Sequence, residues 1–190
     1  MNWSSAPPAP KLKLLHLPGA GRDAIDCAAV PPTASVCNAY GHEISIAEYV
    51  MASMLEITLG LRQMDAALRR NHWAGWWRVG PLHDYVHRKT VGIVGYGRIG
   101  REVARRARAF GMNVIACSRT AKGADEFVER VGDMREFDAV LRASDFILVG
   151  MPLDDASRGL IDARAFTLMK PNAVIINPSR GPIIEEEALY

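Results

Sequence analysis

The sequence predicts an α/β fold that is built around a doubly wound parallel sheet. From residue 91 onwards, short apolar runs alternate with stretches of helical periodicity, which is the pattern of strands joined by crossover helices. The apolar runs are continuous, as is typical of strands that are covered on both faces. A glycine-rich turn joins the first strand to the first helix. The predicted strands are 91–95, 113–117, 146–150 and 173–177, with a weaker one at 127–131, and the predicted helices are 98–110, 134–142 and 161–169.

The glycine-rich turn has the spacing GxGxxG and lies between a strand and an amphipathic helix, which is the context of a Rossmann-type dinucleotide site. Gly95 allows the tight turn, Gly97 lets the backbone approach a pyrophosphate, and Gly100 lets the helix pack closely on the sheet. Arg98 and Ile99 lie at the end of the helix whose N–H groups would face the phosphates. The alternative is a strand-to-helix turn without a ligand.

In such sheets, ligands bind beyond the carboxyl ends of the strands. The candidate contacts that follow the other strands are Ser118, Arg119, Thr120, Met151, Pro152, Ser179 and Arg180. An NAD site would have a carboxylate about 20 residues after the glycines, but this chain has Arg119 between two hydroxyl side chains there. A guanidinium suits a 2′-phosphate, so we expect NADP(H) to be preferred, with NAD(H) possible. The alternative is an exposed arginine on a turn.

The first half of the chain is less regular. We expect a loose segment at 1–10, a strand at 11–17, a turn and short helix at 19–30, and a second strand at 35–40. Ser45 and Glu48 form a capping-box pattern at the start of a helix that runs to about Arg70. Two apolar surfaces run along that helix, so it is either a central core helix or a helix that also contacts a second subunit. Their residues are Val50, Met54, Ile57, Leu61, Met64 and Leu68 on one side, and Met51, Leu55, Thr58 and Leu59 on the other.

Composition excludes several classes of function. A net charge of +2 gives no electrostatic case for nucleic acid, and no apolar run approaches the length of a membrane span. The three cysteines form no CxxC pair, which favours reduced thiols and a cytoplasmic location. The tryptophans and histidines of residues 72–87 lack metal-ligand spacing, so we expect structural packing there and no metal site.

Several motifs resemble the D-isomer-specific 2-hydroxyacid dehydrogenases. They are LKLLHLPGAGRDAID, HEISIAEY, VGIVGYGRIG, SDFILVGMPL, LMKPNAVIINPSRG and IEEEAL, which occur in the family's order and cover nearly all of residues 11–190. The resemblance implies that 1–44 is a remnant of the substrate-binding domain. It also implies that 45–190 is the dinucleotide-binding domain, with a long first helix of the kind that forms dimers. The SRT at 118–120 resembles the NADPH-using glyoxylate/hydroxypyruvate reductases.

The resemblance also implies a reaction, which is hydride transfer between the nicotinamide and C2 of a small 2-keto or 2-hydroxy acid. Arg180 matches the arginine that binds the substrate carboxylate and polarises its carbonyl, and a structural salt bridge is the alternative. The family's acid/base histidine and its glutamate would lie beyond Tyr190. We therefore expect the chain to be a fragment that binds cofactor weakly and, by itself, reduces glyoxylate or hydroxypyruvate at a rate close to background. A non-catalytic dinucleotide-binding module, such as a cofactor sensor or corepressor, is the other hypothesis.

Overall fold

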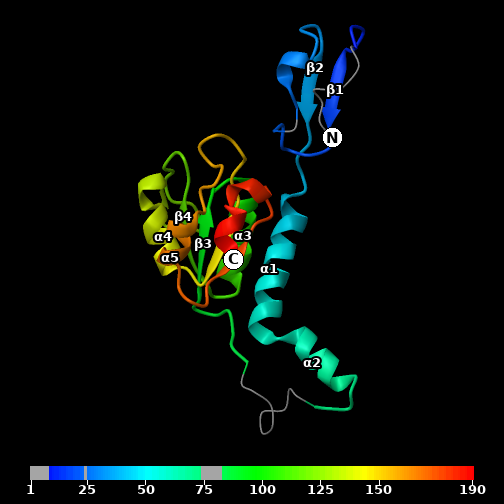
Figure 1. Cartoon of the computed structure of the whole chain (residues 1–190). Coiled ribbons are helices and arrows are strands. Elements are labelled where there is room, and N and C mark those ends of the chain that lie inside the picture. Colours follow the sequence, from blue (N-terminus) through cyan, green and yellow to red (C-terminus); the bar gives the residue numbers. More distant parts are fainter. Residues whose placement is uncertain (1–8, 24, 74–82) are drawn as a thin grey trace.

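A computed structural model describes residues 9–23, 25–73 and 83–190 (Figure 1). Its main part is a five-stranded parallel sheet with the order β5-β4-β3-β6-β7. The strands are β3 (Thr90–Val94), β4 (Asn113–Cys117), β5 (Val131–Gly132), β6 (Phe146–Val149) and β7 (Val174–Ile176). The chain starts in the middle of this sheet and winds outward in both directions, so the predicted doubly wound sheet is confirmed.

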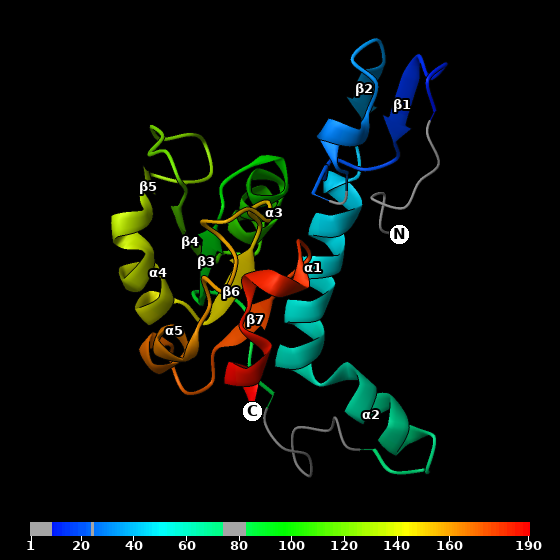
Figure 2. The same cartoon turned by 45° about the horizontal axis from the view of Figure 1, so that its top comes forward.

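Helices cover both faces of the sheet and give the domain three layers (Figure 2). One face packs against α1 (Glu43–Leu59) and α3 (Arg98–Ala109), and the other against α4 (Phe137–Ala143) and α5 (Ala163–Leu168). Alternate residues of one strand point to opposite layers, so Ile93 belongs to the first core and Val94 to the second. Both faces of β3 are therefore buried, which explains its continuous apolar sequence.

The long helix predicted from Ser45 to Arg70 is two helices, α1 and α2 (Leu61–Leu68), which meet at a bend of 59°. Gly60 lies at the bend with a φ of 68°, a left-handed conformation that ends a helix readily when the residue is glycine. The start was also predicted wrongly, because α1 begins at Glu43 and no described side chain caps it. Ser45 donates its hydroxyl to the carbonyl of His42 and does not close a capping box.

The segment before α1 contains a separate two-stranded parallel sheet of β1 (Leu14–Leu17) and β2 (Ser35–Asn38), which lies beyond the amino end of α1 (Figure 1). Both strands are shorter than the predicted 11–17 and 35–40. Between them, the predicted short helix is only a 3₁₀ turn at Cys27–Ala29, which the Asp26 carboxylate caps.

The segment between β4 and α4 departs most from the prediction. The weak strand expected at 127–131 is instead the two-residue β5, because Asp125 accepts the backbone N–H groups of Phe127 and Val128 and turns the chain there. A 3₁₀ turn at Met134–Glu136 precedes α4, and two more, at Gly181–Ile183 and Glu186–Leu189, follow β7.

Two further predictions concern α1, α2 and the residues after them. Among the described residues, no single helix is long and apolar enough to cross a membrane, and α1 and α2 reach that length and hydropathy only when counted together across their bend. Residues 74–82 of the tryptophan-rich stretch lie outside the described residues. Trp73 is described and is 64% exposed, so the structural packing predicted for this stretch is wrong for that residue.

Candidate functional site

The glycine loop follows β3 directly, and two of its three glycines are required by packing. Gly95 has a φ of 102°, and a Cβ built there would lie 2.7 Å from the backbone nitrogen of Met151. A Cβ at Gly100 would lie 2.9 Å from the carbonyl oxygen of Gly95. These contacts are between backbone atoms, so larger residues would force the loop, α3 and the end of β6 apart.

Gly97 is different, because its neighbourhood is open. No described heavy atom lies within 4 Å of a Cβ built at this position, and its φ of −96° is accessible to any residue. Gly97 is the N-cap residue of α3, and no described side chain caps that helix end. The first N–H groups of a helix have no partner within it and form a natural anion site. The loop therefore fits a phosphate group that approaches the backbone at Gly97.

The carboxyl edge of the sheet borders a cleft of about 460 Å³. It is lined by residues from the segment before α1, the starts of α1 and α3, and the turns after β6 and β7. Six of the residues predicted from the sequence lie in it, namely Arg98, Ile99, Met151, Pro152, Ser179 and Arg180. The residues that sequence reasoning missed include Asp23, Tyr40, His42 and Glu43. The cleft is therefore the candidate functional site.

Arg180 enters the cleft from the turn after β7, which Asn177 shapes. The amide of Asn177 donates to the carbonyl of Arg180 at 2.9 Å and accepts the N–H and hydroxyl of Ser179. The Arg180 guanidinium is held by Asp23, with Nε 2.9 Å from one carboxylate oxygen and Nη2 2.9 Å from the other. This hydrogen-bonded ion pair lowers the pKa of Asp23 below its usual value. Gly21 leaves space for the pair, since a Cβ there would overlap the guanidinium.

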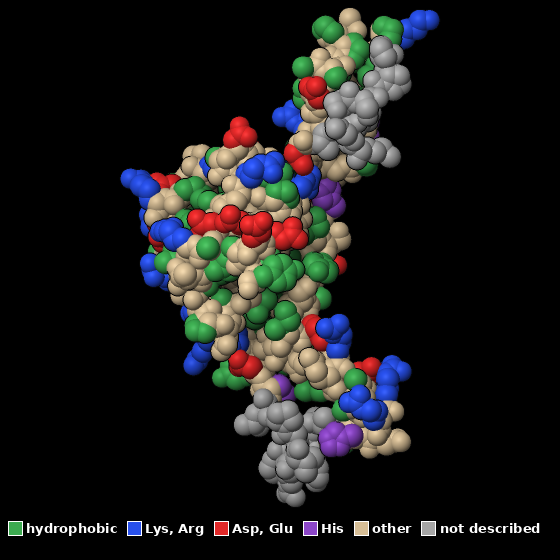
Figure 3. Space-filling model, in the orientation of Figure 1, with side chains coloured by type: hydrophobic (Ala, Val, Ile, Leu, Met, Phe, Trp, Pro, Cys, Tyr) green, Lys and Arg blue, Asp and Glu red, His purple; other side chains and the backbone are tan. Residues whose placement is uncertain are grey.

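Arg98, in the first turn of α3, connects the glycine loop to the segment before α1. Its guanidinium lies 4.6 Å from the centre of the Tyr40 ring and 3.6 Å from a carboxylate oxygen of Glu43. The Glu43 carboxylate also accepts the N–H of Gly41 at 2.8 Å, and such backbone hydrogen bonds, with the nearby Arg98 charge, lower its pKa. On the face drawn in Figure 3, basic side chains lie at scattered points of the rim and acidic ones across the middle.

The predicted 2′-phosphate residues lie after β4 and do not border the cleft. Ser118 donates its backbone N–H to the carbonyl of Gly132 at 3.0 Å, while Arg119 and Thr120 are exposed. The Arg119 guanidinium forms an ion pair with Asp154, from the loop after β6. The sequence therefore placed this arginine at the correct edge of the sheet but did not indicate its acidic partner.

The segment after β4 is fixed to the glycine loop by a buried tyrosine. The Tyr96 hydroxyl donates to Asp125 at 2.7 Å, and Lys122 donates to the Tyr96 carbonyl at 2.7 Å. Burial and the hydrogen bond to Asp125 raise the pKa of Tyr96 well above its ordinary value. Arg101 also reaches Asp125, at 3.2 Å. These contacts hold residues 120–130 against the loop that the site depends on.

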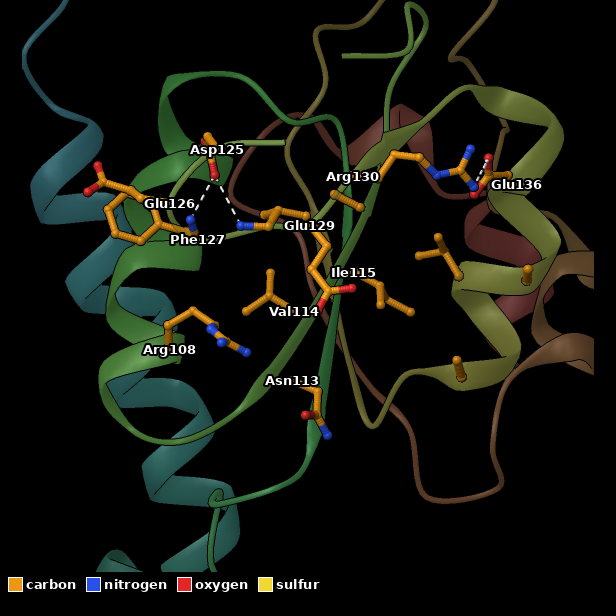
Figure 4. A pocket seen from close by; sticks show the side chains of 15 residues that line it. Arg108, Asn113, Val114, Ile115, Asp125, Glu126, Phe127, Glu129, Arg130 and Glu136 are labelled. Carbon is orange, nitrogen blue, oxygen red and sulfur yellow. Dashed lines mark hydrogen bonds and ion pairs between the residues drawn. The ribbon is translucent and has the colours of Figure 1, made fainter. Parts of the chain in front are cut away.

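A second cavity, of about 570 Å³, lies away from this edge (Figure 4). It is bordered by β4, α4 and the 125–130 turn, where Arg130 pairs with Glu136 at 2.6 Å. None of the residues predicted to bind cofactor or substrate lines it. The cleft at the carboxyl edge, which brings six of the predicted residues together, is therefore the better candidate.

Comparisons with known proteins agree with this geometry. Residues 51–190 match the family model described as D-isomer specific 2-hydroxyacid dehydrogenase, NAD binding domain. A glyoxylate reductase of Thermococcus litoralis is 37% identical over 95% of this chain and 56% of its own length. A D-3-phosphoglycerate dehydrogenase of Methanocaldococcus jannaschii is 38% identical over 96% of this chain and 34% of its own. The chain thus spans about half the length of the first relative and a third of the second.

A solved structure also matches nearly all of this chain over about half of its own length. The D-lactate dehydrogenase of Aquifex aeolicus, complexed with NAD and lactic acid, superposes with a TM-score of 0.80 and 28% identity. The match covers 95% of this chain and 54% of that one. With the family model matching most of its length, this chain belongs to the D-isomer-specific 2-hydroxyacid dehydrogenase family and contains its NAD-binding domain.

Proposed function

We propose that the chain forms the cofactor-binding part of an NADP(H)-preferring dehydrogenase that acts on a small 2-keto or 2-hydroxy acid, such as glyoxylate or hydroxypyruvate. The observation that supports this best is the cleft, where the start of α3 and Arg180 border one space. A phosphate-binding helix end and a carboxylate-binding guanidinium are thereby neighbours. The similarity to a glyoxylate reductase supports the choice of acid.

Each group then has a defined role. The backbone from Gly95 to Gly100 would hold the pyrophosphate, and Arg119, with the flanking hydroxyls of Ser118 and Thr120, would hold the 2′-phosphate. The bound nicotinamide supplies the hydride. Arg180 binds the substrate carboxylate and polarises the neighbouring carbonyl, which the charge of its guanidinium suits. The cleft residues Ile99, Met151, Pro152 and Ser179 shape the space that cofactor and acid share.

Titration with both cofactors tests the preference. The wild-type chain should bind NADPH more tightly than NADH. Binding is measured by the change in cofactor fluorescence. Loss of a charge-assisted contact costs at most about 1.5–3 kcal/mol, and less where the arginine must first leave Asp154, so Arg119→Ala should weaken NADPH binding by up to roughly 150-fold and leave NADH binding nearly unchanged. A wild-type chain that prefers NADH would refute the proposed preference.

A second function is favoured by one observation, which is that Arg180 already holds the Asp23 carboxylate. A non-catalytic dinucleotide-binding module would keep this pair closed and would bind no acid. Calorimetric titration of glyoxylate into chain saturated with NADPH distinguishes the two functions. Saturable binding that Arg180→Ala abolishes supports the dehydrogenase, and cofactor binding without glyoxylate binding supports the module.

We also propose that the boundary between the two domains lies between residues 44 and 45. The three free cysteines support a cytoplasmic location. Finally, we propose that the chain forms a homodimer. The dimer would form through the sides of α1 and α2 that face away from the sheet. The predicted division into two apolar surfaces does not hold, because Val50 and Met54 of one surface and Met51 of the other are all buried within the chain. Large apolar side chains on the two helices remain half-exposed or more, namely Ile44, Tyr49, Ile57, Leu61 and Leu68.

Sedimentation velocity at micromolar concentration tests the dimer. Wild type should sediment as a dimer, and Ile57→Glu should give a monomer with an unchanged circular dichroism spectrum, because a charge is costly inside an apolar interface. Glu48→Gln on the exposed surface of α1 serves as a control. A compact monomer for the wild type at these concentrations would contradict the proposal.

A further inference from the structure

The ion pair between Arg119 and Asp154 lies across the end of the strand that leads into the glycine loop. β4 and β6 are the two neighbours of β3, and the pair joins the loop after β4 to the loop after β6. Backbone hydrogen bonds link the three strand ends at this level, from Gly95 to the carbonyl of Cys117 and from Gly150 to the carbonyl of Val94, both at 2.8 Å. The pair therefore bridges the same edge as the glycine loop.

Asp154 is held in place by its own turn. One of its carboxylate oxygens accepts the N–H of Ser157 at 3.1 Å, while the other meets Arg119. The Ser157 hydroxyl accepts the N–H of Asp154 at 2.8 Å and lies 2.8 Å from the carbonyl oxygen of Pro152. Ser157 is fully buried, which fixes these contacts. The turn thus presents one carboxylate oxygen toward β4, and the loop that contains it arches beyond the strand ends (Figure 2).

A carboxylate and a phosphate compete for the same guanidinium, because both offer paired anionic oxygens to its fork of donors. Building on the proposed function, we propose that Asp154 sets the cofactor specificity of this site. It occupies Arg119 when no 2′-phosphate is present, so NADP(H) must displace a carboxylate and then tolerate a negative charge nearby. NAD(H) has no 2′-phosphate and can bind with the pair intact. Asp154 therefore narrows the NADPH preference that Arg119 provides.

Asp154→Asn is the variant that tests this. It keeps an oxygen for the Ser157 N–H and removes only the charge, so the turn should persist. Removing this charge takes away a competitor for Arg119 and a source of repulsion near a protein surface, and we expect NADPH binding to tighten by roughly fivefold or more while the Kd for NADH changes less than twofold. Asp155→Asn, an exposed neighbour with the same change in charge, is the matched control and should leave both affinities unchanged.

Two further measurements isolate the 2′-phosphate. Adenosine 2′,5′-bisphosphate should bind more tightly to Asp154→Asn than to wild type, whereas 5′-AMP should bind both equally. In an Arg119→Ala background, Asp154→Asn should change the NADPH affinity less than it does beside Arg119, because the competition for the guanidinium is gone and only the repulsion between Asp154 and the phosphate remains. Thermal unfolding of each variant checks that the fold is retained.

The outcomes separate this inference from the function that it builds on. If no variant or wild-type chain binds either dinucleotide, the proposed function fails and the inference fails with it. If both dinucleotides bind but Asp154→Asn and Asp155→Asn have the same effect, only the specificity role of Asp154 is overturned. A weaker affinity of Asp154→Asn for NADPH would also overturn it, because the carboxylate would then be aiding the site.

Discussion

Replacing glycines of the loop one at a time should separate cofactor binding from folding. Gly97→Ala adds a methyl group where no described atom lies within 4 Å and where the backbone is extended, with φ −96° and ψ −155°. Gly95→Ala adds the same group at a φ of 102°, with its Cβ 2.7 Å from the nitrogen of Met151 and 2.8 Å from the carbonyl carbon of Gly150. The two variants carry the same chemical change in different surroundings.

The expected magnitudes follow from these surroundings. Gly97→Ala should change the unfolding free energy by less than about 1 kcal/mol, since alanine restricts the unfolded chain but is a poorer N-cap residue than glycine, so the two effects oppose each other. It should weaken NADPH binding by roughly tenfold or more, because its methyl group obstructs the close approach of the pyrophosphate to backbone N–H groups worth about 1.5–3 kcal/mol. Gly95→Ala should lower the unfolding free energy by about 2–5 kcal/mol, from left-handed strain and overpacking together.

Urea denaturation followed by circular dichroism gives the stabilities, and fluorescence titration gives the NADPH affinities. If the space at Gly97 is open and the pyrophosphate approaches the backbone there, Gly97→Ala is about as stable as wild type and deficient in binding. A Gly97→Ala chain that binds NADPH with wild-type affinity would show that the cofactor does not approach the backbone there. A Gly97→Ala chain that loses as much stability as Gly95→Ala would show that the open space is absent in solution.

Three other outcomes can be checked. Met54→Ala should lower the unfolding free energy by about 2–5 kcal/mol, because Met54 is fully buried, whereas Glu48→Ala at an exposed position of the same helix should change it little, and similar urea midpoints would contradict this. Burial raises the pKa of Cys117 to about 12, so Ellman's reagent should modify the two exposed cysteines in the native chain and the third only in denaturant. The hydrogen bond from Arg180 lowers the pKa of Asp23, so Asp23→Asn should lower the unfolding free energy by about 0–1 kcal/mol, as is usual for so exposed a pair. This difference between wild type and variant should persist above pH 5 and vanish as acid protonates Asp23. A difference that disappears when the pH is raised would refute the prediction.

The sheet could be predicted from the sequence because its signals are local. Each strand is a continuous apolar run, and the alternation with helices leaves few possible topologies. The helix boundaries were less predictable, because the apolar stripe continues through Gly60 and gives no sign of the bend. The start of α1 was misjudged for a similar reason, since Glu43 bonds back to the N–H of Gly41 and replaces the expected capping box.

The site was predicted only in part, because its electrostatic contacts join distant residues. Chain position placed Arg180 at the ligand edge, but its partner Asp23 is 157 residues away, and no spacing rule connects them. Arg119 and Asp154 are 35 residues apart on two different loops. Strand ends can be found from apolar runs, whereas the pairing of side chains between loops depends on how the loops fold over the sheet edge.

The two arginines expected to bind anionic groups of the ligands share one property, which is that each already holds a carboxylate of the chain. Asp23 holds Arg180, and Asp154 holds Arg119. Ligand binding at either position is therefore an exchange of one anion for another, and its net free energy is smaller than that of a contact made from a fully hydrated arginine. In return, the guanidinium groups remain oriented between binding events, and an exchange favours ligands with more charge or better geometry than a carboxylate. A 2′-phosphate meets that condition at Arg119, while a substrate carboxylate only equals Asp23 and must gain its advantage from the rest of the molecule. Cofactor discrimination at this edge should accordingly depend on the acidic partners as much as on the arginines themselves.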